Sequence, residues 1–387
     1  MNEKDRPFVQ EVEIMLLRNG NVFDGELFLE GLEVRLSGGT VAETGYDLQA
    51  ADGEKIIDLE GDYLLPGFVD VHIHAFKGRD TMDGEEAVRH MSRELLQYGV
   101  AGFCPTTMSA GEEDTRKAVT GIRAVMDAPE KEGAAVLGAH MEAPFLQEER
   151  AGAQRKEFFQ DPDWNAFERM TGGRTDTVRL ITLAPERNGS EAFIRKAVSG
   201  GIHVSIGHTS ADAETFHQAV KHGADHVTHT FNAQTPLKHR APGIPGAALT
   251  EDKVYCEMIC DGIHLHRDIV RLIARCKGAG KAVAITDAME AAGMPEGDYA
   301  LGGQRVIVKE GAARLEDGTL AGSVLTMPKA LENLIHLFGI DPAEACAMCT
   351  STPADSVGES GFGRIRAGSP VPLTRWSRKW EYKGIVR

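Results

Sequence analysis

The chain has 387 residues, of which 42% are hydrophobic and 26% are charged, and its formal net charge is −16. This composition is ordinary for a soluble globular protein, and the length suits a barrel with a small appended domain. The acidic balance argues against nucleic acid or an anionic membrane as a partner, because both are repelled at long range. A phosphorylated metabolite is still compatible with it, since a few local cations can hold one phosphate.

Cysteine usage and the N-terminal sequence bear on the compartment. The six cysteines follow no disulfide framework. Cys346 and Cys349 form a CxxC without a second cysteine pair at zinc spacing, so we expect them to pack inside a helix. The first residues are charged and lack an apolar stretch, so no signal peptide is expected. No window approaches the length of a membrane span. We therefore expect a soluble, cytoplasmic protein.

Residues 8–60 read as short strands separated by Gly-containing turns, and strand-like sequence returns after about residue 363. Pairing these two segments predicts a small β-sandwich domain from residues 1–62 and 360–387. The intervening residues 63–359 would form a second domain.

From residue 66 onward, apolar runs alternate with helical patterns. The expected strands are eight in number, at 68–74, 100–107, 135–142, 178–185, 202–208, 226–231, 254–261 and 282–287. The clearest helical stretches between them are 84–98, 112–126, 190–199, 212–222 and 267–277. Alternation of this kind implies parallel βαβ units, and eight of them form a (β/α)₈ TIM barrel. A doubly wound open sheet would want a Gly-rich phosphate turn after its first strand, where this chain has histidines. After the eighth strand we expect a hairpin at 299–315 and helices at 323–338 and 342–349.

Six of the eight expected strands end in a group suited to metal binding or proton transfer. These groups are His72 and His74, Glu142, His208, His229, Asp261 and Asp287. The carboxyl ends of barrel strands build the active site in this fold. His72 and His74 are two positions apart and so share one face of their strand. Imidazole with carboxylate suits a divalent zinc or iron ion.

Further assignments follow from position. Asp287 can take a proton from water and return it to a leaving amine, although an aspartate here could also cap a helix. His140 shares the face of Glu142, and we expect it to support a ligand or fill the core. His203 begins a strand and is expected to be structural, and His226, three residues before His229, should point to the opposite face of its strand.

Ordered motifs carry a resemblance to a known family. They read LPGFVDVHIH at 65–74, HMEAPF at 140–145, GHT at 207–209, THTFNA at 228–233, DGIH at 261–264, TDAM at 286–289 and LAGSVLTM at 320–327. Over residues 14–368 the chain resembles the N-acetylglucosamine-6-phosphate deacetylases of the amidohydrolase superfamily. The resemblance implies hydrolysis of the acetamide of N-acetylglucosamine 6-phosphate to glucosamine 6-phosphate and acetate, with Asp287 as the catalytic acid/base.

The resemblance also implies site residues and partners. It makes Glu142, His208 and His229 the primary metal ligands, with His72 and His74 completing a second position, so one or two ions are expected. The implied substrate-binding residues are Ala153, Gln154, Asn232, Ala233, Arg240, Asp261, His264, Leu320, Ala321 and Gly322. Asn232, Ala233 and Arg240 would grip the phosphate, and residues 320–322 would lie along the acetyl group. The family is typically homodimeric, and a neighbouring subunit can complete the phosphate pocket.

Departures from the family pattern keep alternatives open. Gln154 stands where the family usually has histidine, Ala143 replaces a glycine, and residues 75–79 replace a Gly-rich loop. N-acetylgalactosamine 6-phosphate or another N-acyl hexosamine phosphate is therefore an alternative substrate. Cyclic amide opening or nucleobase deamination would favour a lysine at the end of the fourth strand, which residues 182–186 lack. A non-catalytic sugar-phosphate sensor would be expected to have lost a ligand or the base, and all are present.

Overall fold

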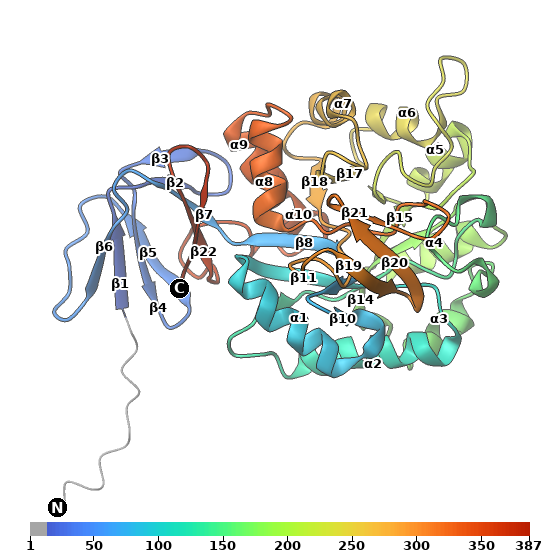
Figure 1. Cartoon of the computed structure of the whole chain (residues 1–387), viewed down its shortest axis with the longest axis horizontal. Coiled ribbons are helices and arrows are strands. Elements are labelled where there is room, and N and C mark those ends of the chain that lie inside the picture. Colours follow the sequence, from blue (N-terminus) through green and yellow to red (C-terminus); the bar gives the residue numbers. More distant parts are fainter. Residues whose placement is uncertain (1–13) are drawn as a thin grey trace, which may run out of the picture.

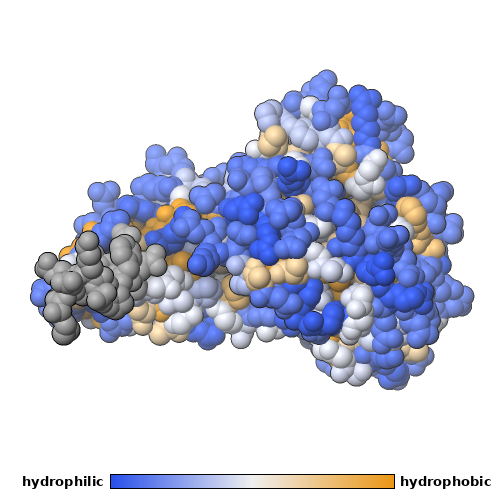
Figure 2. All heavy atoms as spheres, turned by 90° about the horizontal axis from the view of Figure 1, so that it is seen from below, coloured by the Kyte–Doolittle hydropathy of each residue, from blue (hydrophilic) through white to orange (hydrophobic). Residues whose placement is uncertain are grey.

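The computed structural model describes residues 14–387, so the expectation of no signal peptide falls on residues outside the described part. Figure 1 shows a small lobe of strands beside a larger lobe in which helices surround a central sheet. The face in Figure 2 is mainly hydrophilic, with scattered apolar spots. Within the described chain, no helix has both the length and the apolar character needed to cross a bilayer.

The central sheet of the larger lobe has a strand at each of the eight expected positions. Its strands are β8 (Phe68–Ile73), β11 (Val100–Thr107), β12 (Ala135–Val136) with β13 (Ala139–Met141), β14 (Val178–Leu183), β15 (His203–Ile206), β16 (His226–Val227), β17 (Tyr255–Ile259) and β18 (Ala282–Ile285). Every ladder between them is parallel, and the spatial order follows the chain. The predicted (β/α)₈ barrel is confirmed.

Most of the expected strands end a residue or more before the predicted position, and two differ further from the prediction. The third is broken between Val136 and Ala139, where Gly138 adopts a φ of +138°. The sixth ends at Val227 rather than 231, because His229, Phe231 and Ala233 all take positive φ values that no extended strand allows. In both cases the polar rim residue, Glu142 or His229, follows the last strand residue rather than lying within the strand.

The barrel closes where its last strand meets its first. The Asp287 N–H donates to the carbonyl of His72 at 2.9 Å. Below the rim, the buried Asp70 carboxylate accepts a hydrogen bond from Thr286 Oγ1 at 2.6 Å. Burial raises the pKa of Asp70 to about 6, although its hydrogen bonds from Thr286 act in the opposite direction. Side-chain and backbone bonds together therefore join β18 to β8.

The outer helices follow the predicted amphipathic pattern. The five expected helices are confirmed as α1 (Glu85–Gln97), α2 (Glu112–Asp127), α4 (Ser190–Ser199), α5 (Ala213–Lys221) and α7 (Arg267–Lys277). In α7 the buried positions Val270, Ile273, Ala274 and Lys277 recur at helical spacing. Helices α3 (Trp164–Met170) and α6 (Gly243–Thr250) escaped prediction. The sequence of α6 holds two glycines and a proline, which are poor helix formers.

Three more helices follow late in the chain, namely α8 (Met327–His336), α9 (Pro342–Cys349) and α10 (Ser351–Ser356). The helix expected at 323–338 begins at Met327 because Ser323 instead forms a bridge with Ala288 beside β18. Helix α9 has the expected bounds. Its Cys346 and Cys349 are free and buried, so the expected packing role is confirmed.

An antiparallel sheet follows β18 and covers one side of the barrel mouth. The expected hairpin is present with a third strand, as β19 (Gly297–Leu301), β20 (Gln304–Lys309) and β21 (Ala312–Arg314). Its Leu301 packs in one apolar cluster with Met108, Met289 and Ala321. Gln304 Nε2 donates to the carbonyl of Ala153 at 2.6 Å. The small sheet is thereby fastened to loops at the carboxyl end of the barrel.

The small lobe is a sandwich of two sheets. One has the order β5 (Thr40–Gly45), β4 (Glu33–Ser37), β1 (Ile14–Arg18), β6 (Lys55–Asp58); the other has the order β23 (Tyr382–Val386), β22 (Leu373–Trp376), β7 (Tyr63–Pro66), β2 (Asn21–Phe23), β3 (Phe28–Glu30). Apolar residues from both sheets, such as Leu17, Val34 and Leu373, share one core. The predicted β-sandwich built from both ends of the chain is confirmed. Trp376 meets Phe68 edge to face at 6.2 Å, which joins the sandwich to the barrel.

Candidate metal centre and active site

The carboxyl rim of the barrel gathers six polar side chains that the sequence placed at the ends of five different strands. His72 belongs to β8, whereas His74, Glu142, His208, His229 and Asp287 come within two residues of the ends of their strands. All six are at most 7% exposed. His208, His229 and Asp287 have φ values of 46°, 29° and 49°. A left-handed backbone conformation costs of order 1 kcal/mol per residue, and residues that bear this strain are often found at functional sites.

Glu142, His208 and His229 form the first cluster. Glu142 Oε1 lies 3.2 Å from His208 Nε2 and 3.1 Å from His229 Nε2, and the two nitrogens are 3.1 Å apart. His208 Nδ1 lies 2.8 Å from the carbonyl of Arg150, which makes it the donor and leaves Nε2 unprotonated in the neutral ring. Two nitrogens and a carboxylate oxygen that converge in this way fit a divalent cation such as zinc or iron.

His72, His74 and Asp287 form an adjoining cluster with the same kinds of ligand atom. The Nε2 atoms of His72 and His74 are 3.4 Å apart, and they lie 3.5 and 3.2 Å from Asp287 Oδ1. Glu142 joins the two clusters, since its Oε2 is 3.2 Å from His74 Nε2. The residues present therefore fit one cation or two neighbouring cations.

The carboxylates govern the charge of the imidazoles. Burial alone would lower the pKa of His72, but the charges of Glu142, Asp287 and Glu257 raise it to about 9. In turn, burial pushes the pKa of Asp287 upward, yet the imidazoles of His72 and His74 hold it below its ordinary value. The same negative potential that favours protons on these imidazoles favours a cation between them.

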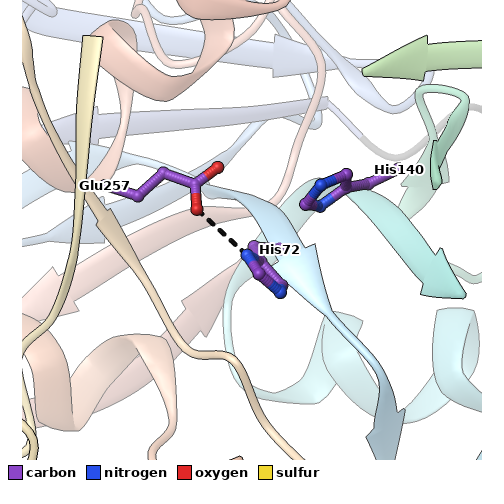
Figure 3. A group of neighbouring side chains, drawn as sticks. All are labelled: His72, His140 and Glu257. Carbon is purple, nitrogen blue, oxygen red and sulfur yellow. Dashed lines mark hydrogen bonds and ion pairs between the residues drawn. The ribbon is translucent and has the colours of Figure 1, made fainter. Parts of the chain in front are cut away.

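Two buried residues support the rim from below. Glu257, in the middle of β17, accepts a hydrogen bond from His72 Nδ1 at 3.0 Å (Figure 3). His140 Nε2 lies 2.8 Å from Thr182 Oγ1, and burial lowers its pKa well below the ordinary value. Sequence reasoning missed Glu257, although a charged residue inside the apolar strand Tyr-Cys-Glu-Met-Ile was an available signal.

A cavity of about 290 Å³ opens beside the clusters. Among the residues that line it are most of those expected at the site, namely His74, Glu142, Ala153, Gln154, His208, His229, Asn232, Ala233, His264, Asp287, Leu320 and Gly322. His72, Arg240, Asp261 and Ala321 are absent from this lining. Asp261 Oδ2 instead holds His264 Nδ1 at 2.7 Å, and Ala321 is buried in the apolar cluster behind the mouth.

Two arginines are placed differently relative to the cavity, one outside its lining and one within it. Arg240 is exposed on the loop before α6, away from the cavity lining. Arg150, which sequence reasoning did not single out, lines the cavity. Its Nε is shielded from solvent and has no hydrogen-bond partner within residues 14–387. Among the lining residues in the described chain, Arg150 alone carries a permanent positive charge.

Gln154 is engaged by the protein on both ends of its amide. Its Oε1 accepts the Ser109 N–H at 2.7 Å, and its Nε2 donates to Glu142 Oε2. This arrangement fixes the second oxygen of a candidate metal ligand. It leaves less of the Gln154 amide free to read a sugar hydroxyl than the sequence suggested.

Fold and site together define a class, that of (β/α)₈ hydrolases with a metal-competent rim. Residues 63–382 match the model of the Amidohydrolase family, and the chain belongs to this family, whose chemistry is metal-dependent. It is accordingly a hydrolase that acts on an amide.

Individual relatives agree with this assignment. The chain is 34% identical over 357 residues to the N-acetylglucosamine-6-phosphate deacetylase of Lysinibacillus sphaericus, covering 92% of this chain and 91% of the relative. It is 32% identical over 357 residues to the N-acetylgalactosamine-6-phosphate deacetylase of Escherichia coli O157:H7, covering 91% and 92%. The crystal structure of N-acetylglucosamine-6-phosphate deacetylase from Pasteurella multocida superposes with a TM-score of 0.90 at 28% identity, covering 96% of this chain and 98% of that one.

Proposed function

We propose that this protein hydrolyses the acetamide of N-acetylglucosamine 6-phosphate, giving glucosamine 6-phosphate and acetate. The convergence of Glu142, His208, His229 and Asp287 at one cavity carries the proposal. The similarity to deacetylases of amino-sugar phosphates supports the choice of substrate. Free thiols at all six cysteines support a reducing, cytoplasmic setting.

The two clusters would hold the cofactor. Glu142, His208 and His229 would bind the principal cation, and His72 with His74 and Asp287 would bind a second where two are loaded. The mixed imidazole and carboxylate set supports zinc or iron. When bound, such an ion acts as a Lewis acid that polarises a carbonyl and makes water easier to deprotonate.

Asp287 would move the proton. Its pKa is held below the ordinary value by His72 and His74, so the carboxylate is ionised near neutral pH and can accept a proton. Asp287 takes the proton of the attacking water as the new bond forms to the acetyl carbon. It then returns that proton to the sugar nitrogen as the carbon–nitrogen bond breaks, which gives a neutral amine and acetic acid. The acid loses its remaining proton to solvent and leaves as acetate. One carboxyl group thus serves as base and then as acid.

Phosphate recognition would combine local and neighbouring groups. Arg150 supports it from within the cavity, and Asn232 and Ala233 line the same space. Arg240 lies on an exposed loop, from which it would reach the site of a partner in a homodimer. The proposal of a homodimer rests on this exposure and on the family resemblance.

The alternative substrate is the epimer N-acetylgalactosamine 6-phosphate. Gln154 keeps this alternative open. It replaces the family histidine, and its amide is hydrogen-bonded to Ser109 and Glu142 rather than free to contact the sugar. Epimer selection would then fall to other lining residues. The Escherichia coli relative, named for the galactose epimer, is nearly as similar as the first glucose-type relative.

The deciding experiment measures acetate release by the metal-loaded chain on both phosphorylated epimers. A higher kcat/KM for the glucose epimer supports the proposal, and the reverse preference supports the alternative. Tight binding of both sugar phosphates without acetate release would contradict both and would indicate a sensor. Metal analysis of the same sample ensures that absent activity is not due to an absent cation.

A further inference from the structure

Glu257 is a buried carboxylate that the proposed chemistry leaves without a role. It lies in the middle of β17 with 0% exposure. No lysine or arginine within residues 14–387 forms an ion pair with it; the partner of its carboxylate is His72. Removing a carboxylate from water is costly in free energy, so its retention inside the barrel requires specific compensation.

One oxygen of Glu257 supplies that compensation by contacting both candidate metal clusters. Oε2 accepts from His72 Nδ1 at 3.0 Å and from the backbone N–H of His229 at 3.0 Å. His229 is the ligand with the strained φ of 29°, so this bond helps to hold its turn. The other oxygen, Oε1, is buried and has no partner in the described chain. Glu257 therefore fixes one side chain and one backbone turn at once.

The contact with His72 has a chemical consequence. A neutral imidazole carries one proton, and a proton donated from Nδ1 to Glu257 leaves the Nε2 lone pair free. That Nε2 faces the rim, 3.4 Å from His74 Nε2 and 3.5 Å from Asp287 Oδ1. His140 packs edge-on against the His72 ring at 4.5 Å and is itself bonded to Thr182, so it does not compete for Nδ1 (Figure 3).

We propose that Glu257 is a positioning residue that holds His72 in the Nδ1-protonated form and so makes the His72, His74 and Asp287 cluster a cation site. This inference rests on the proposed metal-dependent function. It assigns to Glu257 the orientation of a ligand rather than contact with the substrate.

The first test is a cation titration of metal-free protein, with zinc as the probe and no substrate present. We expect the wild-type chain to bind two ions, and Glu257→Gln to weaken the ion at the His72 cluster by about 10–100-fold. The ion at the Glu142 cluster should be weakened less, because its ligand His229 loses only a backbone contact. The matched control is Asp62→Asn. Asp62 is also a buried carboxylate that accepts two hydrogen bonds, from Arg375 Nε at 2.6 Å and Lys383 Nζ at 2.7 Å, but it lies in the small lobe. Its zinc affinities should equal those of the wild type.

A second variant separates positioning from a general structural role. If Glu257 acts through His72, then His72→Gln and the double variant with Glu257→Gln should show the same affinity for the ion at the His72 cluster. Unchanged zinc affinities in folded Glu257→Gln, or a wild-type chain that binds a single ion, would overturn the proposal.

A spectroscopic measurement on the wild-type protein covers the case in which Glu257→Gln fails to fold. Nitrogen-15 shifts of His72 in the zinc-loaded chain should show a protonated Nδ1 and an unprotonated Nε2. The opposite tautomer would overturn the proposal. Because neither readout uses substrate, a chain that shows both expected results but releases no acetate would contradict only the proposed function.

Discussion

Replacing Arg150 with glutamine tests whether the cavity is built for a phosphate. Arg150 lines the cavity and is the one lining residue in the described chain with a permanent positive charge, so its guanidinium is the group expected to meet a phosphate. A hydrogen bond to a charged group contributes about 1.5–3 kcal/mol. Because each 1.4 kcal/mol of binding free energy changes a dissociation constant tenfold, Arg150→Gln should raise KM for the phosphorylated sugar about 10–150-fold. The kcat should change little, because ground state and transition state lose the same contact.

Steady-state acetate release on phosphorylated and unphosphorylated N-acetylglucosamine provides the assay. The carbonyl of Arg150 that meets His208 Nδ1 belongs to the backbone and survives the substitution. The control is Arg155→Gln, since Arg155 pairs with Glu157 outside the cavity lining and should keep its KM. An unchanged KM in Arg150→Gln, or an equal loss on the unphosphorylated sugar, would refute a phosphate contact.

Three further changes probe proton transfer, acid stability and barrel closure. Asp287→Asn should lower kcat about 10²–10⁴-fold in the acetate assay; activity above a tenth of wild type would contradict its role. Burial alone would raise the pKa of Asp225, but its interactions with His226 and His203 hold that pKa far below its ordinary value. The ionised carboxylate therefore adds to the free energy of unfolding above the unfolded-state pKa of about 4, and this contribution is lost as the pH falls from there towards the folded-state pKa. Urea unfolding at pH 7 and pH 3 should show a smaller pH effect in Asp225→Asn than in wild type, and parallel losses would count against the pairing. Asp70→Ala leaves the buried hydroxyl and N–H of Thr286 without an acceptor. It should lower the unfolding free energy by about 2–4 kcal/mol in the same experiment, and a loss below 1 kcal/mol would show that Asp70 is not needed for closure.

Local pattern determined the barrel and its metal-competent rim. Strand alternation, helical periodicity and the two-residue spacing of His72 and His74 are properties of neighbouring residues, so they are legible in the sequence. Because parallel strands share one carboxyl edge, polar residues at the ends of six of the eight strands already implied a common site. The same logic could not foresee the left-handed turns at His208 and His229, which end their strands early.

Contacts between distant strands were decided only by the tertiary structure. The Asp70–Thr286 bond that closes the barrel joins residues 216 apart, and the His72–Glu257 bond joins residues 185 apart. Which cation faces the cavity, Arg150 rather than Arg240, depends on how loops from different βα units fold over the mouth. Periodicity reports which face of an element is buried. It does not report which buried groups meet across the barrel, because that depends on the order, tilt and closure of all eight strands.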